Sequence, residues 1–412
     1  MVKRSPRVYY GWVLVATLGV TETISWGVLY YAFSVVLTPM ERDLGWSRAT
    51  VTGAFSLALV VSGLAAAPVG RWLDGHGARG LMTVGSIAGA VLTVAWANVG
   101  DPLSFYVVWA GVGIVMAMTL YEPAFAVVAH WFDRQRNRAL TAVTLMAGFA
   151  STIFLPLTSW LVEIQGWRAA LLTLAALLAI GTIPAHGLVL RRRPEDLGLR
   201  VDGDAAGADR GTATVNAEDV QLRAALRDRN FYLLVVAFSL ASIVAFGMAV
   251  HLVAILVDRG YDPLAAAGVA GLVGAMQVLG RLVLGPIGDR YSLRVVSAAL
   301  LAVQPVAVLL LIFVPGTIGV VAFVALFGAA KGGMTIVRPG FVVSLYGRAN
   351  YASIAGVLAV AVILAQALAP VVIGAAYDRF GSYTPILLLL VVVSAVSSAA
   401  VLPIRTPRAA LM

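Results

Sequence analysis

Long apolar runs, separated by short polar connections, alternate along almost the whole chain. An α-helix needs about 20 mainly apolar residues to cross the hydrocarbon core of a membrane, and each of these runs is long enough. The pattern therefore predicts an all-α membrane protein with twelve transmembrane helices. The predicted helices cover residues 9–38, 49–70, 80–98, 103–130, 138–162, 168–190, 231–257, 264–287, 293–314, 317–338, 350–376 and 382–403.

One long polar stretch interrupts this pattern at residues 191–229. Its middle combines glycine with charged residues and has few apolar ones, so it cannot build a packed core and is predicted to be a mobile linker. We therefore expect an N-terminal six-helix bundle over residues 1–190, a cytoplasmic linker over 191–229 and a C-terminal six-helix bundle over 230–412.

Composition and charge support a membrane protein. The 412 residues are 60% hydrophobic and 12% charged, with a mean hydropathy of +0.92, whereas about a quarter of the residues in soluble domains are charged. The net charge is +9, but the basic residues lie in short loops between the apolar runs, so we do not expect a nucleic-acid partner. Because Lys and Arg concentrate in alternate loops, we predict a multi-pass protein of the cell inner (plasma) membrane with both termini cytoplasmic.

Several classes of site have no candidate residues in the sequence. The chain has no cysteine, which excludes disulfides, thiolate metal sites and a thiol nucleophile. Phosphate-binding, zinc-protease and serine-hydrolase motifs are also missing from the sequence. We therefore expect no enzyme activity, no cofactor and no metal, and any transport must be secondary.

A Gly-x-x-x-Asp pattern closes both the second and the eighth predicted helix. Its recurrence six helices later predicts two related six-helix halves. The residues of the two motifs are Gly70, Asp74, Gly77 and Arg79 in the first half and Gly285, Asp289 and Arg290 in the second.

The first motif resembles the loop between helices two and three of the major facilitator superfamily. The chain departs from that pattern at Trp72, where Leu is usual, and at Gly75-His76, where an arginine is common. The resemblance implies the major facilitator fold, with the motif residues acting as a cytoplasmic gate that latches the two bundles. The alternative is a solvated turn that carries only the positive charge typical of the cytoplasmic side.

Three patches resemble a narrower group, the monocarboxylate porters and oxalate/formate antiporters. They are residues 9–13, the run 111–123 in helix four, and Arg281, which stands where the group carries a substrate-binding arginine. The chain has Tyr30 and Gln277 where some members carry Lys and Asp, so proton coupling by that pair is not expected.

Arg281 is the strongest candidate for substrate binding, because a charged side chain inside a membrane helix is costly and usually functional. Its planar fork of donors suits bidentate capture of a carboxylate. The alternative is a structural ion pair with Glu22 or Glu122.

Glu22 lies near the middle of helix one, and Glu122 lies between Tyr121 and Pro123 in helix four. Either carboxyl is a candidate for proton coupling, and a neutral carboxyl that only joins helices is the alternative for Glu22. Tyr121 and Tyr30 are candidate substrate contacts, with ordinary aromatic packing as the alternative for Tyr121. Pro123 is predicted to kink helix four.

Helix ten carries two further cations, Lys331 and Arg338. Lys331 lies deep in the span and is a candidate second contact to the substrate anion or the partner of a buried Glu, whereas Arg338 can reach the membrane surface. Among the histidines, His251 is the one whose pH dependence we would test.

These features together predict a secondary active transporter of a small organic anion, with a monocarboxylate favoured. It would work by alternating access with coupling to protons or a counter-anion, as a monomer in membrane lipid. One alternative is an exporter of drugs or other hydrophobic or cationic solutes, and a second is a membrane sensor that does not transport.

Overall fold

The computed structural model describes residues 9–203, 221–288, 293–346 and 351–404. Within these ranges every regular element is helical, which confirms the predicted all-α membrane protein. The described residues contain 11 stretches long and apolar enough to span a membrane. One of them, Arg136–Val189, holds Gly166 with φ of 77°, and this left-handed turn separates the predicted fifth and sixth helices.

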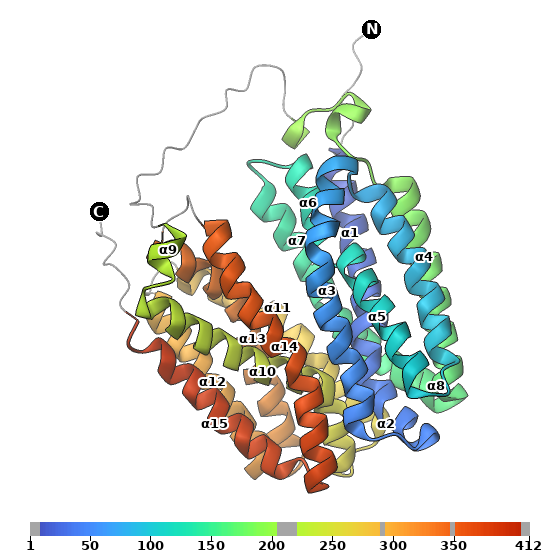
Figure 1. Ribbon diagram of the computed structural model, residues 1–412, viewed down its shortest axis with the longest axis vertical. Coiled ribbons are helices and arrows are strands. Elements are labelled where there is room, and N and C mark those ends of the chain that lie inside the picture. The colour runs from blue at the N-terminus through green and yellow to red at the C-terminus, as the bar shows by residue number, and fades with distance from the viewer. Residues whose placement is uncertain (1–8, 204–220, 289–292, 347–350, 405–412) are drawn as a thin grey trace. The chain divides into compact units, whose positions relative to one another are not determined.

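The chain divides into two compact units. The first consists of Met1–Met40 and Leu57–Thr212, and the second consists of Glu41–Ser56 and Ala213–Met412. The second unit therefore includes a short segment from the N-terminal part of the sequence, which hydropathy alone did not indicate. Figure 1 shows both units with their helices labelled.

Helices of the first unit are interrupted at two places that hold candidate residues. The π-helix η1 (Gly27–Tyr31) joins α1 and α2 within the first span. The fourth span breaks at Leu120, where the backbone is extended, and this agrees with the kink expected from Pro123. The longer elements of the N-terminal part are α1 (Tyr10–Trp26), α2 (Ala32–Leu44), α3 (Arg48–His76), α4 (Ala78–Ala97), α5 (Pro102–Thr119), α6 (Tyr121–Trp131), α7 (Arg136–Gly148), α8 (Ala150–Pro184) and η2 (Ala185–Val189). The end of α2 and the start of α3 fall within Glu41–Ser56 and so belong to the second unit.

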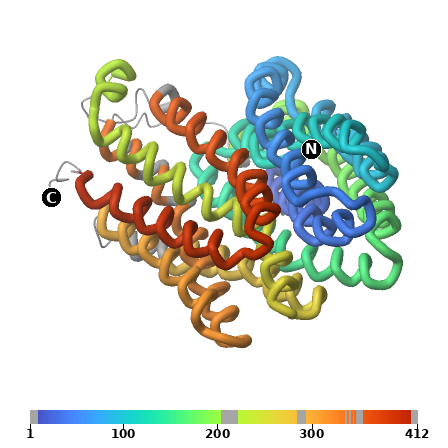
Figure 2. The backbone as a smooth tube through the Cα atoms, turned by 60° about the horizontal axis from the view of Figure 1, so that its bottom comes forward, coloured from blue at the N-terminus to red at the C-terminus, as the bar shows by residue number. Residues whose placement is uncertain are grey.

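The second unit is built from long helices that pack in pairs. Its elements are α9 (Leu222–Ala225), α10 (Arg229–Asp258), α11 (Pro263–Gly288), α12 (Leu293–Phe313), α13 (Gly316–Tyr346), α14 (Tyr351–Phe380) and α15 (Thr384–Val401). The pair α11 and α13 shares the most extensive contact, and α12 lies beside α15 in the tube view of Figure 2.

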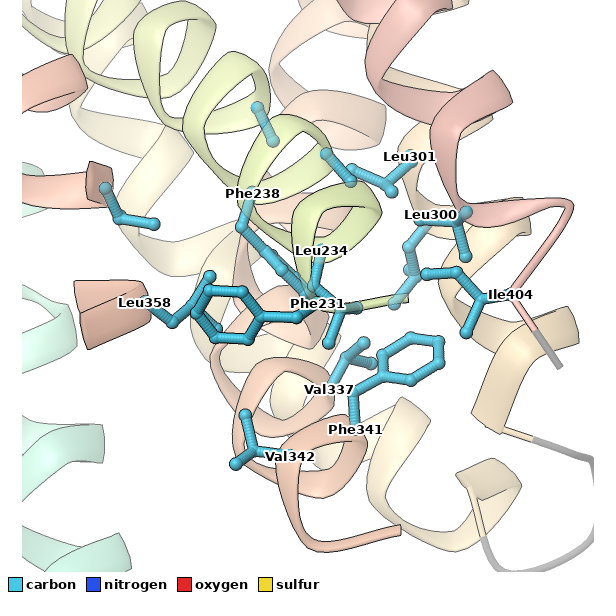
Figure 3. Packing of buried hydrophobic residues seen from close by; sticks show 14 of the residues in the cluster. Phe231, Leu234, Phe238, Leu300, Leu301, Val337, Phe341, Val342, Leu358 and Ile404 are labelled. Carbon is cyan, nitrogen blue, oxygen red and sulfur yellow. The ribbon is translucent and has the colours of Figure 1, made fainter. Parts of the chain in front are cut away.

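Aromatic and branched aliphatic side chains fill the core of the second unit. Figure 3 shows Phe231 and Phe238 of α10 among side chains of α12, α13 and α14. Phe238 and Phe341 meet edge to face, with ring centroids 6.4 Å apart. This packing holds α13, which carries two of the candidate cations, against α10.

The described parts of the linker contain short helices. Three short helices lie within residues 191–229, namely η3 (Pro194–Leu197), η4 (Val201–Gly203) and α9. Asp202 of η4 accepts backbone hydrogen bonds from residues 133–135, just before α7. Ala225 of α9 is buried in the core of the second unit. The middle of the linker, which composition predicts to be mobile, falls mostly on residues 204–220, and these lie outside the described ranges.

Candidate functional site

Glycines let α11 and α13 of the second unit approach so closely that their backbones touch. A Cβ atom added at Gly280 would overlap the carbonyl oxygen of Ala329, and one added at Gly332 would overlap that of Gln277. Only glycine permits such contacts, because any other side chain would force the helices apart. The contact brings the residues that flank these glycines together.

Arg281 of α11 and Lys331 of α13 are the cations placed beside this contact. Each is half-buried, and each lies next to one of the two glycines. They are close enough for the charge of Arg281 to act on Lys331. Gln277, one turn before Arg281, is buried and adds an amide to the same region. The sequence proposed both cations separately, and the structure places them together.

Glu22 is a fully buried acid of the first unit. Its side chain is 0% exposed, and neither carboxyl oxygen forms a hydrogen bond of normal geometry with the described residues. Trp26, one turn later in α1, is its polar neighbour, although the indole N–H does not reach bonding geometry either. A buried carboxyl with so few partners has capacity to hold a proton or to receive a donor from a ligand.

Aromatic rings form a cluster beside Glu22. Trp26 contacts Tyr30 and Tyr121, with ring centroids 5.2 and 5.1 Å away, and Tyr121 stacks on Phe125 at 5.1 Å. Tyr30 lies in η1, where the π-helical turn changes the direction of the following side chains. The break at Leu120 places Tyr121 at the first position of α6. Both candidate tyrosines therefore belong to one cluster around Trp26.

Glu122 has a different environment from Glu22. It lies at the second position of α6 and is exposed within the structure. An exposed carboxyl at a helix N-terminus is favoured by the helix dipole and needs no further partner. The geometry therefore supports Glu22 more strongly than Glu122 as a proton carrier.

The first Gly-x-x-x-Asp motif is mostly helical rather than a loop, because α3 continues to His76. Gly70 and the exposed Asp74 belong to this helix, and only Gly77, with φ of 79°, forms the turn into α4. Arg79 donates from Nε to the Gly187 carbonyl at 2.8 Å and so stabilises the end of η2. In the second motif Gly285 lies in α11, whereas Asp289 and Arg290 lie outside the described residues.

A charged cluster in the second unit was missed by the sequence interpretation. Arg48 is only 8% exposed and forms a bidentate ion pair with Glu41, at 2.8 and 2.7 Å. Its guanidinium lies 3.9 Å from the ring centroid of Tyr377 and donates to the Tyr383 hydroxyl at 2.9 Å. The sequence interpretation placed Arg48 in a loop, since it stands at the border of an apolar run, and nothing local indicates partners more than 300 positions away.

Comparisons with known proteins agree with this architecture. The family model described as Major Facilitator Superfamily matches residues 18–354. Monocarboxylate transporter 13 of Bos taurus is 28% identical over 331 residues, which are 79% of this chain and 73% of the relative. Monocarboxylate transporter 12 of Homo sapiens is 23% identical over 419 residues, covering 92% of this chain and 77% of the relative.

Solved structures share the fold. A crystal structure of the nucleoside transporter NupG aligns with a TM-score of 0.74 at 14% identity, over 94% of this chain and 98% of that one. The family match extends over most of the chain, and the relatives and the solved structure are transporters. This multi-pass membrane protein therefore belongs to the Major Facilitator Superfamily and is a transporter rather than an enzyme.

Proposed function

We propose that this protein is a secondary active transporter of a small organic anion, a monocarboxylate in the first instance. The observation that carries the proposal is the pair of cations Arg281 and Lys331, brought together inside membrane helices by the glycine contact of α11 and α13. Two adjacent positive charges at this depth favour an anionic ligand. The relatives named monocarboxylate transporters support the same class of solute.

Each candidate residue has a distinct role in this proposal. The Arg281 fork binds the carboxylate in a bidentate manner, and Lys331 adds a second positive charge. Tyr121 and Tyr30 orient the solute through their rings and hydroxyls. Glu22 exchanges the coupled proton, with Glu122 as the weaker candidate. The protein acts as a monomer in the inner membrane with both termini in the cytoplasm, and the residues from Gly70 to Arg79 contribute to the cytoplasmic gate.

A second candidate function is export of hydrophobic or cationic solutes. It is favoured by the first unit, in which a buried carboxyl lies beside the rings of Trp26, Tyr30 and Tyr121. Aromatic faces and a carboxylate together attract organic cations. The two candidates differ in the charge of the solute, so a transport assay can separate them.

Uptake of labelled lactate and pyruvate into proteoliposomes with an imposed pH gradient tests the first candidate. We expect uptake by the parent protein and a loss of at least about tenfold for Arg281→Ala, because one charge-assisted bidentate contact disappears. Arg281→Lys should also lose most activity, since an ammonium cannot replace the planar fork. Arg223→Ala, at an exposed position of α9, is the matched control and should transport normally.

Retention of uptake by both Arg281 variants would refute the proposed binding site. Failure of the parent protein to take up any carboxylate, combined with movement of a cationic dye that Glu22→Gln abolishes, would instead establish the second candidate. Binding of a carboxylate without any flux would indicate a sensor.

A further inference from the structure

A chain of hydrogen bonds connects Arg48 to α14 through the second unit. The Tyr383 hydroxyl, just before α15, accepts from Arg48 Nη1 at 2.9 Å and lies 2.8 Å from His251 Nδ1. His251 Nε2 lies 2.9 Å from the Pro370 carbonyl oxygen. Both His251 and Tyr383 are buried, with 0% and 2% of their surfaces exposed.

The groups at each step of this hydrogen-bond chain determine which atoms carry its protons. A carbonyl oxygen can only accept, so His251 Nε2 must carry the hydrogen that faces Pro370. In a neutral imidazole Nδ1 is then an acceptor, and it receives the Tyr383 hydroxyl proton. The Tyr383 hydroxyl thus accepts from Arg48 through its oxygen and donates its own hydrogen to His251. Every donor therefore meets an acceptor only while His251 is neutral.

Protonation of His251 disrupts this arrangement of donors and acceptors. A hydrogen on Nδ1 would point at the Tyr383 oxygen, which then faces two donors, His251 and Arg48. The Tyr383 hydroxyl proton would have to turn away from His251, the acceptor that it faces while the imidazole is neutral. A buried donor that loses its partner destabilises its surroundings, so the Tyr383 contacts must loosen.

Charged groups around His251 set the balance of this change. Arg48 of α3 shares the Tyr383 hydroxyl with His251 and opposes a second positive charge, but Glu41 of α2 neutralises Arg48 through the bidentate pair. Asp378 of α14, whose carboxylate accepts from the Arg48 and Ala49 amides, adds a negative charge to the same cluster. Further out, Asp258 of α10 accepts a hydrogen bond from Tyr377 of α14 at 3.0 Å. The cluster thus contains acids on three of its helices that can compensate a proton on His251.

The cluster also holds the segment Glu41–Ser56 in the second unit. Thr52 Oγ1 occupies the space where a Cβ of Gly374 would lie, and Ser56 Oγ accepts from the Val371 amide at 3.2 Å. Arg48 is the residue of this segment that reaches Tyr383. The rest of the same helix, from Leu57 onwards, belongs to the first unit.

We propose that His251 is a proton-responsive residue whose protonation breaks the Arg48–Tyr383 link and loosens the segment Glu41–Ser56 from the second unit. This goes beyond the proposed solute site, because none of these residues belongs to it. The loosening itself does not depend on the proposed function. Only its further consequence, the coupling of protons to transport, rests on that function.

Cysteine labelling of purified protein in detergent tests this mechanism without any substrate. The native chain has no cysteine, so a single Thr52→Cys reporter is unambiguous. Thr52 is 0% exposed and becomes accessible only when the segment loosens. Arg42→Cys, at an exposed position of the same segment, corrects for the pH dependence of the thiol reaction itself.

We expect the normalised maleimide labelling rate of Thr52→Cys to rise about fivefold between about pH 7.5 and about pH 4, the effect of losing one buried hydrogen bond. His251→Gln in the reporter background retains a donor towards Pro370 and cannot titrate in this range, so its labelling should be slow at both pH values. Tyr383→Phe removes the link itself and should label fast at both.

An unchanged rate in the parent reporter between the two pH values would overturn the proposal. A rise that persists in His251→Gln would do the same, because another group would then be responsible. If His251→Gln does not fold, Tyr383→Phe decides: fast, pH-independent labelling supports the proposal, and labelling like the parent overturns it. Because no solute is involved, failure of carboxylate uptake would leave this result intact.

Discussion

The carboxylate of Asp378 caps the helix that begins at Arg48, since its Oδ1 accepts the Arg48 amide hydrogen bond at 2.9 Å. Its Oδ2 accepts from the Ala49 amide at 2.8 Å, so one side chain satisfies two of the donors that a helix start leaves open. The negative charge also interacts favourably with the positive end of the α3 dipole. A single residue near the end of α14 thus fixes the start of α3.

Removal of this cap should be measurable as lost stability. We expect Asp378→Ala to lower the free energy of unfolding by about 1 to 2 kcal/mol, because two amides lose their acceptor. Asp101→Ala is the matched control, since Asp101 caps only its own helix through the Ser104 amide and should lower Tm less. Thermal unfolding in detergent gives both values, and equal Tm shifts would show that Asp378 acts only as an ordinary exposed cap.

The glycine contact between α11 and α13 gives a second prediction. Gly280→Ala places a methyl group against the Ala329 carbonyl and should cost about 1 to 3 kcal/mol through overpacking. It should also reduce uptake, because Arg281 would move relative to Lys331. Gly268→Ala, in the same helix but with no atom within 4 Å of the added Cβ, should leave Tm unchanged or raise it. Equal behaviour of the two variants in thermal unfolding and uptake would contradict the role given to this contact.

Hydropathy predicted the helices correctly because each span has its own apolar run, whatever its neighbours are. The kink of the fourth span also has a local cause in Pro123, which lacks a backbone donor. The affiliation of Glu41–Ser56 with the second unit has no local cause. It depends on pairs such as Arg48 with Asp378 and Arg48 with Tyr383, which a single sequence cannot reveal.

The candidate site also combines features that are visible in the local sequence with features that depend on tertiary contacts. Glu22, Arg281 and Lys331 could be found from sequence, because a charge inside an apolar run is visible as such. That Arg281 and Lys331 lie together follows from the register of two glycine-rich helices, and glycine content alone does not fix that register. The sequence also could not separate Glu22 from Glu122, since their different exposure arises from the break at Leu120 and from the packing of α1.

Glu22→Gln should separate proton coupling from solute binding. The amide keeps the shape of the buried carboxyl but cannot exchange a proton. We expect equilibrium exchange of labelled solute to continue, whereas accumulation driven by a pH gradient should fall to the level without a gradient. Glu122→Gln, at the exposed neighbour of Tyr121, should retain driven accumulation. Loss of driven accumulation in Glu122→Gln alone would transfer the coupling role to Glu122.

Asp202 should control how firmly the start of the linker is held on the first unit. Its Oδ2 accepts from the Asp133 and Arg134 amides at 3.1 and 2.8 Å, and its Oδ1 accepts from the Gln135 amide at 3.3 Å. Asp202 itself has φ of 59°, a left-handed conformation that Asp and Asn tolerate better than Ala. Asp202→Ala therefore removes the acceptors and adds backbone strain at the same position.

The expected consequence is release of the segment that contains Arg200. Trypsin should cleave after Arg200 about five to ten times faster in Asp202→Ala, because local opening replaces a docked turn. Asp202→Asn keeps one acceptor oxygen and the left-handed preference, so its cleavage rate should lie between those of the parent and Asp202→Ala. Asp196→Ala is the control, since Asp196 bonds only to the Arg193 amide at 3.1 Å within its own short helix. Equal acceleration by Asp196→Ala would mean that the short helix, rather than the Asp202 contact, protects the linker.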